Sequence, residues 1–115
     1  MSAVVRVFTH AGIVAAKVDA GGGRFSTDSV YFLRQPYLGR QTITATSSAA
    51  QSSLSTIAIN KTTLVHVEVQ DGKTVHIEIN PPNRSVAAST DSPTTRGKTS
   101  FEFGPEWTIS VLEAV

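Results

Sequence analysis

The sequence predicts an all-β fold, a single-domain antiparallel β-sandwich or small barrel of about eight short strands. Apolar and polar residues alternate with a period of two over residues 63–69 and 75–79, which is typical of half-buried strands. Other short apolar runs recur along the chain and are separated by turn-forming glycine, proline, asparagine and aspartate. A length of 115 residues suits one domain, so we treat residues 1–115 as a single β domain.

The charge and the hydrophobicity of the sequence indicate which classes of partner to expect. The chain has 10 basic and 9 acidic residues, a net charge of +1, and both signs of charge are mixed along its length. This mixture indicates no basic patch for nucleic acid and no acidic tail. The first eight residues lack the pattern of a signal peptide, and no apolar stretch approaches the ~20 residues that span a bilayer. We therefore expect no nucleic-acid partner and no membrane partner. Without cysteine, the chain forms no disulfide.

Residues 63–79 predict a central β-hairpin. A two-residue turn would mix apolar and polar residues on each face, whereas a three-residue turn, Gln70-Asp71-Gly72, keeps them apart. In that register Val67 faces Val75 and His66 faces His76. The hairpin would then have one β-branched face for the core and one largely polar face.

The first part of the chain predicts a second hairpin. Residues 4–8 form a β-branched run, His10-Ala11-Gly12 suits a turn, and residues 13–18 would return antiparallel with Phe8 near Val14. A helix over residues 11–20 is the alternative, because alanine and lysine are good helix formers; we favour the strand. The glycines that follow, 21–23, predict a loop and not a phosphate cradle, since no phosphate-binding motif follows them.

Further strands and loops follow in order. We predict strands over residues 30–33, 41–46, 57–59, 86–88, 101–103 and 107–111. In the last of these, Trp107, Ile109 and Val111 share one face and are expected in the core. The Ser/Ala-rich residues 47–55 predict an exposed loop or a mobile arm. Residues 84–100 predict a long loop, a kind of segment that is usually functional or disordered.

One cluster of residue types suits a metal ion. In the predicted hairpin His66 and His76 face each other, with Glu68 and Glu78 nearby, and imidazoles plus a carboxylate can hold zinc. A third ligand would have to be one of these carboxylates or His10, and nothing in the spacing fixes it. The exposed face of a hairpin explains the same residues, so we expect no metal site.

Sequence patterns for phosphate binding, nucleophilic catalysis and sugar binding are equally weak. Residues 96–99, Arg-Gly-Lys-Thr, match the end of a phosphate-binding loop. The pattern also requires a glycine five residues before Gly97, and Ser92 occupies that position. Nothing matches a G-x-S-x-G nucleophile elbow. Tyr31, Tyr37 and Trp107 could form a sugar-stacking platform, although such residues more often belong to a core or its rim. We expect no catalytic residue, no cofactor and no enzyme activity.

From about residue 41 to the C-terminus the chain resembles small β-sandwich virion proteins of tailed bacteriophages, of the head decoration or auxiliary capsid type. The resemblance lies in four stretches: Q-T-I-T at 41–44, T-L-V-H-V-E-V at 63–69, V-H-I-E at 75–78, and F-E-F-G-P-E-W-T-I-S-V at 101–111. In such proteins a T-x-L-V-x-V strand precedes a hairpin and a W-x-I-S-V strand closes the domain. Residues 1–40 fall outside the resemblance and are expected to form an N-terminal hairpin or an arm.

This resemblance implies a non-enzymatic virion structural protein, made in the host cytoplasm, that binds and stabilises the head shell as a capsid decoration or cement protein. It implies the major capsid protein or other virion proteins as partners, and a homo-oligomer for which we expect a trimer. The alternative from another class is a carbohydrate-binding or adhesion module associated with a tail or fibre. Two exposed aromatic side chains on one sheet face would favour that alternative.

Overall fold

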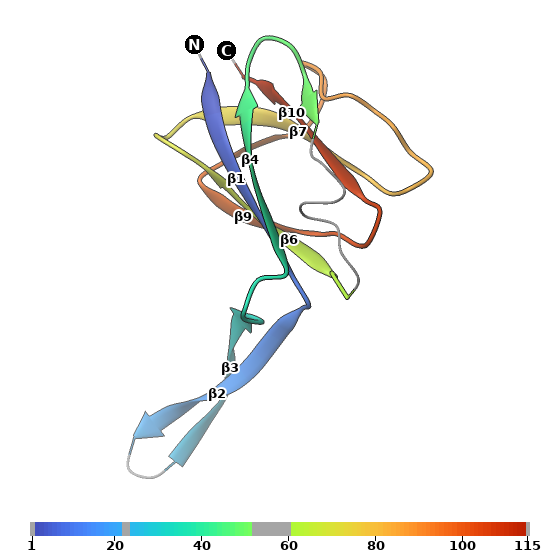
Figure 1. The fold of residues 1–115 in the computed structure, drawn as a ribbon. Helices are drawn as coiled ribbons and strands as arrows, with labels where there is room; N and C mark the ends of the chain where they lie inside the picture. The colour runs from blue at the N-terminus through green and yellow to red at the C-terminus, as the bar shows by residue number, and fades with distance from the viewer. Residues whose placement is uncertain (1, 22–23, 52–60, 115) are drawn as a thin grey trace.

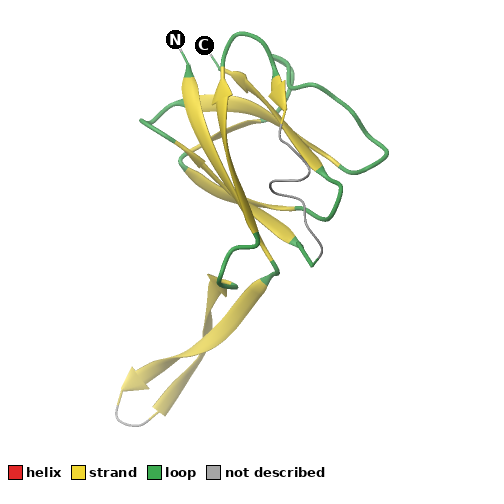
Figure 2. Cartoon of the chain, in the orientation of Figure 1, coloured by secondary structure: helices red, strands yellow, loops and turns green. Residues whose placement is uncertain are grey.

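The computed structural model describes residues 2–21, 24–51 and 61–114, and these residues form strands and loops with no helix (Figure 2). The prediction of an all-β fold is therefore confirmed. No segment of these ranges is a helix long and apolar enough to span a membrane. The strands are β1 (Ala3–His10), β2 (Ile13–Gly21), β3 (Arg24–Leu33), β4 (Gly39–Ala45), β5 (Ala50–Gln51), β6 (Leu64–Val69), β7 (Thr74–Asn80), β8 (Thr94–Arg96), β9 (Lys98–Glu102) and β10 (Thr108–Glu113).

Two four-stranded sheets form the body of the molecule (Figure 1). The first sheet has the order β4-β1-β6-β9 and the second has the order β5-β10-β7-β8; all their pairings are antiparallel. A separate two-stranded sheet, β2-β3, extends away from the body, and we call it the arm. The body is thus a sandwich, as its alternating sequence predicts.

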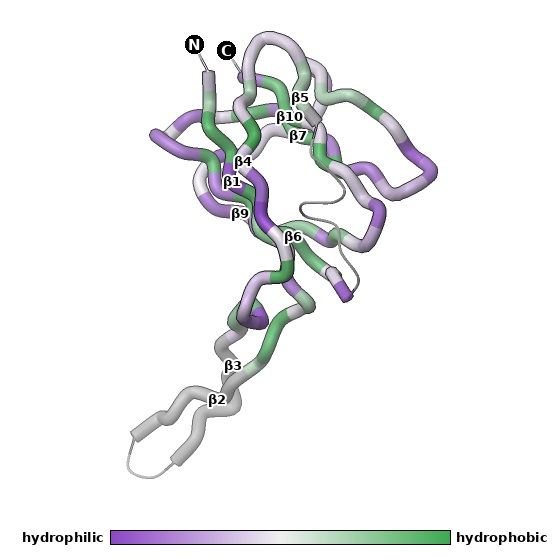
Figure 3. The backbone as a smooth tube through the Cα atoms, viewed as in Figure 1, coloured by the Kyte–Doolittle hydropathy of each residue, from purple (hydrophilic) through white to green (hydrophobic). Residues whose placement is uncertain are grey.

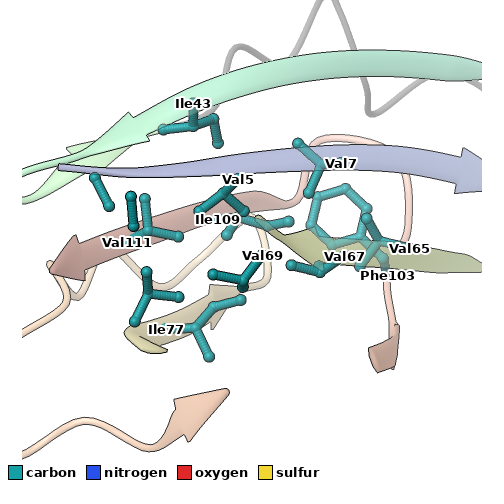
Figure 4. Packing of buried hydrophobic residues seen from close by; sticks show 13 residues of the cluster. Val5, Val7, Ile43, Val65, Val67, Val69, Ile77, Phe103, Ile109 and Val111 are labelled. Atoms are coloured by element: carbon teal, nitrogen blue, oxygen red, sulfur yellow. The ribbon is translucent and has the colours of Figure 1, made fainter. Parts of the chain in front are cut away.

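The core lies between the two sheets, where the apolar residues of alternating strands meet (Figure 4). On β1 and β6 every second residue is buried, as the period-two pattern requires. Trp107 packs edge-on against Phe103, with ring centroids 6.0 Å apart. The buried cluster comprises Ala3, Val5, Val7, Ile43, Ala45, Val65, Val67, Val69, Val75, Ile77, Phe103, Ile109 and Val111. These include Ile109 and Val111, as predicted, while Trp107 is partly buried against them.

The predicted central hairpin is wrong in its pairing and right in its faces. β6 and β7 belong to different sheets, and the chain crosses between them over residues 70–73. Val67 lies opposite Val7 on one side and Thr99 on the other, so it never pairs with Val75. The turn does not decide between the two arrangements, because Gly72, with a φ of 65°, has the left-handed conformation that the predicted three-residue loop also requires. What decides between them is distant sequence, since β1 and β9 take both edges of β6.

The predicted N-terminal hairpin is wrong as well, although residues 13–18 are a strand and not a helix. β1 lies between β4 and β6, and Phe8 is opposite Arg40 and His66 instead of being near Val14. The chain continues from β1 into β2 without reversing, and Val14 pairs with Phe32 of β3. Of the predicted glycine loop, Gly21 ends β2 and the next two residues lie outside the described ranges.

The arm continues the β1–β4 pair beyond the body (Figure 1). At the junction the Leu38 backbone N–H donates to the Thr9 carbonyl at 2.7 Å, and the Arg34 N–H donates to the Gly12 carbonyl at 2.8 Å. The radius of gyration is 16.1 Å, whereas a compact domain of this length has about 13 Å. The longest dimension is 55 Å. The first forty residues therefore divide between a central strand of the sandwich, β1, and a projecting hairpin.

The segment 84–100 is an ordered part of the sandwich and not one long loop. Residues 94–96 form β8 and residues 98–100 belong to β9, while the predicted strand over 86–88 is absent there. Residues 84–93 cover the outer face of the second sheet. The Asn80 side chain donates to the Val86 carbonyl at 2.9 Å and accepts from the Val86 N–H at 3.2 Å. The Ala88 N–H donates to the Ser110 hydroxyl at 2.9 Å.

Glu78 holds the same covering segment from the second sheet. The Ser92 hydroxyl donates to the Glu78 carboxylate at 2.6 Å, and Arg84 donates to it at 2.8 Å. These hydrogen bonds, from Ser92 first and then from Arg84, lower the pKa of Glu78 below its usual 4.5. A segment held by these hydrogen bonds is part of the domain, so residues 84–93 are not a disordered loop.

Two other predicted segments lie partly or wholly beyond what the structure describes. The predicted strand over 57–59 lies outside the described residues. Of the Ser/Ala-rich run 47–55, residues 47–51 form a turn and the short strand β5, and the others lie outside the described ranges.

Candidate functional site

Two neighbouring hollows open on the outer face of the first sheet, beside the base of the arm. The first has a volume of about 540 Å³ and is lined by Arg6, Phe8, Arg40, Gln41 and Thr42. The second has a volume of about 260 Å³. Its lining residues are Phe8, His10, Leu33, Gln35, Tyr37, His66 and Glu68. Phe8 lines both hollows, so they share one wall.

Strand alternation brings Arg6 and Phe8 of β1, Arg40 and Thr42 of β4, and His66 and Glu68 of β6 to one face. On β1 the buried Val5 and Val7 point into the core, so Arg6 and Phe8 point outward. The β1–β4 register places Arg6 opposite Thr42 and Phe8 opposite Arg40. On the other side of β1, the register with β6 places Glu68 opposite Arg6. The first hollow is therefore cationic, while the second combines imidazole, carboxylate, amide and aromatic groups.

Phe8, which lines both hollows, packs against Tyr37, which lines the second. The rings of Phe8 and Tyr37 lie 5.4 Å apart at 63°, the edge-to-face arrangement that aromatic rings prefer. Phe8 is half-buried in the sheet face and Tyr37 is exposed. Tyr37 comes from the connection between β3 and β4, so the pair also fixes that connection against the body.

His66 and Glu68 form the polar part of the second hollow. The His66 Nε2 atom lies 3.8 Å from a Glu68 carboxylate oxygen, and its Nδ1 atom lies 3.1 Å from the Ser100 hydroxyl. Desolvation lowers the pKa of His66 below its usual 6.5; Glu68 opposes this shift, whereas His10 and Lys98 add to it. His66 is thus held toward its neutral form, which can accept as well as donate a hydrogen bond.

His10 lies deeper, with 3% of its surface exposed. Its Nδ1 atom is 2.9 Å from the Arg34 carbonyl oxygen, at the point where the chain returns from the arm. This contact gives His10 a structural task at the junction between arm and body.

The predicted cluster of His66 with His76 does not form. The two residues lie on β6 and β7, hence in different sheets. His76 instead contacts the Ser92 carbonyl through Nδ1 at 3.0 Å, and Glu78 is paired with Arg84 and Ser92. In the described ranges no three histidine, cysteine, aspartate or glutamate side chains are placed to hold a metal ion.

The three aromatic residues considered for sugar stacking lie in different parts of the molecule and form no common platform. Trp107 packs against Phe103 at the edge of the core. Tyr31 lies on the arm, and Tyr37 lines the second hollow and packs against Phe8. In their place the structure brings Phe8 next to Tyr37, a pair that sequence reasoning missed. The alternation of residues 4–8 signals that Phe8 and Arg6 share a face, but their partners on β4 follow only from the pairing.

Residues 96–99 take no part in either hollow. Arg96 ends β8, Gly97 makes a turn with φ of 65°, and Lys98 begins β9, so no helix follows this turn. The rejection of a phosphate-binding loop is confirmed here, because that loop requires a strand before it and a helix after it.

Comparisons found no protein-family model, no curated protein and no solved structure that matches this chain.

Proposed function

We propose that this protein is a non-enzymatic structural component of a bacteriophage particle, a decoration or cement protein that attaches to the head shell. The observation that carries the proposal is the projecting arm. Its exposed apolar side chains include Tyr31 at 64%, Phe32 at 56% and Ile13 at 53% exposed surface. The hydrophobic residues at the base of β2 are seen in Figure 3.

The arm has the properties of an element that binds a partner. A two-stranded hairpin is at best marginally stable alone in water. Cross-strand pairs put Ile13 beside Leu33 on one face and Val14 beside Phe32 on the other, so apolar residues lie on both faces. Exposed apolar surface of this kind is typical of protein–protein contact sites. A neighbouring subunit of a shell would bury both faces, and many copies on one lattice would add multivalent affinity.

The resemblance of residues 41–111 to phage head proteins supports the identity of the partner. On this proposal the partners are the major capsid protein and further copies of the chain, arranged as trimers, and the mature location is the virion. Binding to a shell requires no cofactor and no turnover.

The test is to mix the purified protein with phage particles that lack it and to image them. A second sample carries Tyr31→Ser and Phe32→Ser, which remove two large exposed apolar side chains from the arm and leave the described core unchanged. We expect saturable, symmetric density on the head with the original protein and none with the variant. Density on the head that is equal for both proteins would show that the arm is not the attachment element.

The adhesion module is the second candidate, and the exposed Tyr37 beside Phe8 favours it. Aromatic rings next to polar groups bind the faces of sugars, and Gln35, His66 and Glu68 supply polar groups in the second hollow. Density on the tail alone would move the protein to another virion role. Absence of binding to any particle, together with measurable affinity on a glycan array, would establish the adhesion module instead.

A further inference from the structure

Arg6 and Arg40 are two exposed arginines without a charged partner. In the described part of the chain the ion pairs are His66 with Glu68 and Arg84 with Glu78, and neither Arg6 nor Arg40 makes a side-chain hydrogen bond there. Arg84 shows the contrast, because its guanidinium donates to the Ile79 carbonyl, the Asn80 side chain and Glu78. Arg84 therefore stabilises the contact between the second sheet and the segment that covers it, whereas Arg6 and Arg40 make no such contacts in the described residues.

The sheet nevertheless holds Arg6 and Arg40 close together. Arg6 is opposite Thr42 and Arg40 is two residues before Thr42 on β4, so the two arginines are diagonal neighbours on one face. Both line the first hollow. Like charges held on neighbouring positions disfavour each other, and an anion between them converts this repulsion into attraction.

The nearest acidic residue leaves the hollow cationic. Glu68 is opposite Arg6 across the β1–β6 pair, but its carboxylate is directed to His66 Nε2 at 3.8 Å. On the far side of β6, Lys98 is opposite Glu68. Among the described residues no ion pair joins Glu68 to Arg6 or Arg40, so both guanidiniums keep an unpaired charge.

The other lining groups suit a ligand that is partly flat and partly polar. Each guanidinium presents a planar fork of N–H donors that matches the two oxygens of a carboxylate or phosphate. Thr42 adds a hydroxyl, and Phe8 adds a half-buried aromatic surface. We propose that the Arg6–Arg40 hollow binds an oxyanion, a carboxylate or phosphate group, on a ligand whose apolar part lies on Phe8. This site is separate from the arm and does not depend on the proposed attachment to a shell.

The site can be tested on the whole protein by NMR titration. The probes are inorganic phosphate, glucuronate as a carboxylated sugar, and glucose as its neutral analogue. We expect saturable shifts of the Arg6, Arg40 and Phe8 side-chain signals with at least one anion and none with glucose. Shifts with phosphate alone assign the site to phosphate groups, and shifts with glucuronate alone assign it to carboxylates. Equal shifts with glucose, or no shifts with either anion, would overturn the proposal.

Matched variants separate a built site from general charge attraction. Arg6→Gln and Arg40→Gln each remove one fork and should weaken binding about tenfold, the effect of losing one charge-assisted contact. Arg96→Gln is the control, because Arg96 is an exposed arginine on β8 of the other sheet and its loss changes the net charge equally. We expect no change in affinity for this control. Equal weakening in all three variants would show that the anions follow net charge alone, which would contradict the site.

Discussion

At the scale of single residues, the division between core and surface follows the period of two along each strand. Val65, Val67 and Val69 are buried, while His66 and Glu68 between them point outward. Sequence alone predicts this division, because it depends only on strand geometry. Which residues meet across strands depends on pairing, so the first hollow, with Arg6 on β1 and Arg40 on β4, could not be predicted.

Truncating one residue of each kind tests the division. We expect Val67→Ala to lower the free energy of unfolding by roughly 1–3 kcal/mol, because it removes buried methyl groups and leaves a cavity. His66→Ala should cost less than about 1 kcal/mol, since it loses one half-exposed contact. Chemical denaturation of both variants measures the difference. Equal losses would contradict the assignment of faces.

The second prediction at this scale concerns the proton of His66. The folded protein lowers the pKa of His66 below its usual 6.5, chiefly through desolvation. The unfolded chain then binds a proton more readily, so His66 lowers stability as the pH falls below 6.5 and has no such effect above it. Glu68→Gln should lower this pKa further, because the carboxylate favours the charged ring. An NMR titration of the His66 ring measures both values.

His66→Gln supplies the matching stability measurement. The variant cannot take up this proton, so its free energy of unfolding should fall less than that of the original protein between neutral and mildly acidic pH. A pKa of His66 that rises in Glu68→Gln would contradict the role of the Glu68 carboxylate. Identical pH profiles for the two proteins would show that burial does not lower the pKa of His66.

At the scale of elements, local sequence and long-range pairing contribute differently. Alternation and turn residues locate β1, β4, β6, β7 and β10 to within a few residues, but they find only part of β2, β3 and β9. They do not tell whether consecutive strands form a hairpin or cross to the opposite sheet, as β6 and β7 do across Gly72. The same limit explains the metal cluster: His66 and His76 are outward residues of two different sheets. Residues 84–93 are a loop, as predicted, but the sequence did not show that Asn80, Glu78 and Ser110 bind this loop to the second sheet.

Gly97 makes another crossing between the sheets, from β8 to β9, in a single residue. Its φ is 65°, and no atom lies within 4 Å of an added Cβ. Gly97→Ala should therefore lose only the conformational preference, about 1 kcal/mol of the free energy of unfolding. Gly97→Asn should lose less, because asparagine tolerates the left-handed region. Urea denaturation gives both values, and an equal loss in the two variants would point to a clash instead.

At the scale of the whole molecule, the body has a buried hydrophobic core, whereas the arm contributes no described residue to it. The buried cluster draws its residues from β1, β4, β6, β7, β10 and Phe103, and none of the described core side chains comes from the arm. Replacing residues 13–33 by a short Asn-Gly turn should then leave the midpoint of chemical denaturation nearly unchanged. The hydrodynamic radius should fall, since the arm sets the long dimension.

The same variant has a clear contrary outcome. Loss of cooperative unfolding after removal of residues 13–33 would show that the arm supports the core. The matched control replaces Tyr31 and Phe32 by serine within the full-length chain, which keeps the arm but lowers its apolar surface. It should retain the original hydrodynamic radius.

The order of strands also has a consequence for the folding rate. The arm pairs strands that are adjacent in the chain, so it can close early, yet it brings no described core residue into place. Core contacts such as Val5 with Val69 join distant parts of the chain and must wait for large loops to close. Folding should accordingly be slow for a protein of this length, as in other domains dominated by non-local pairing. During that delay the unpaired edges of β6 would be exposed to other chains, which makes low protein concentration favourable for refolding.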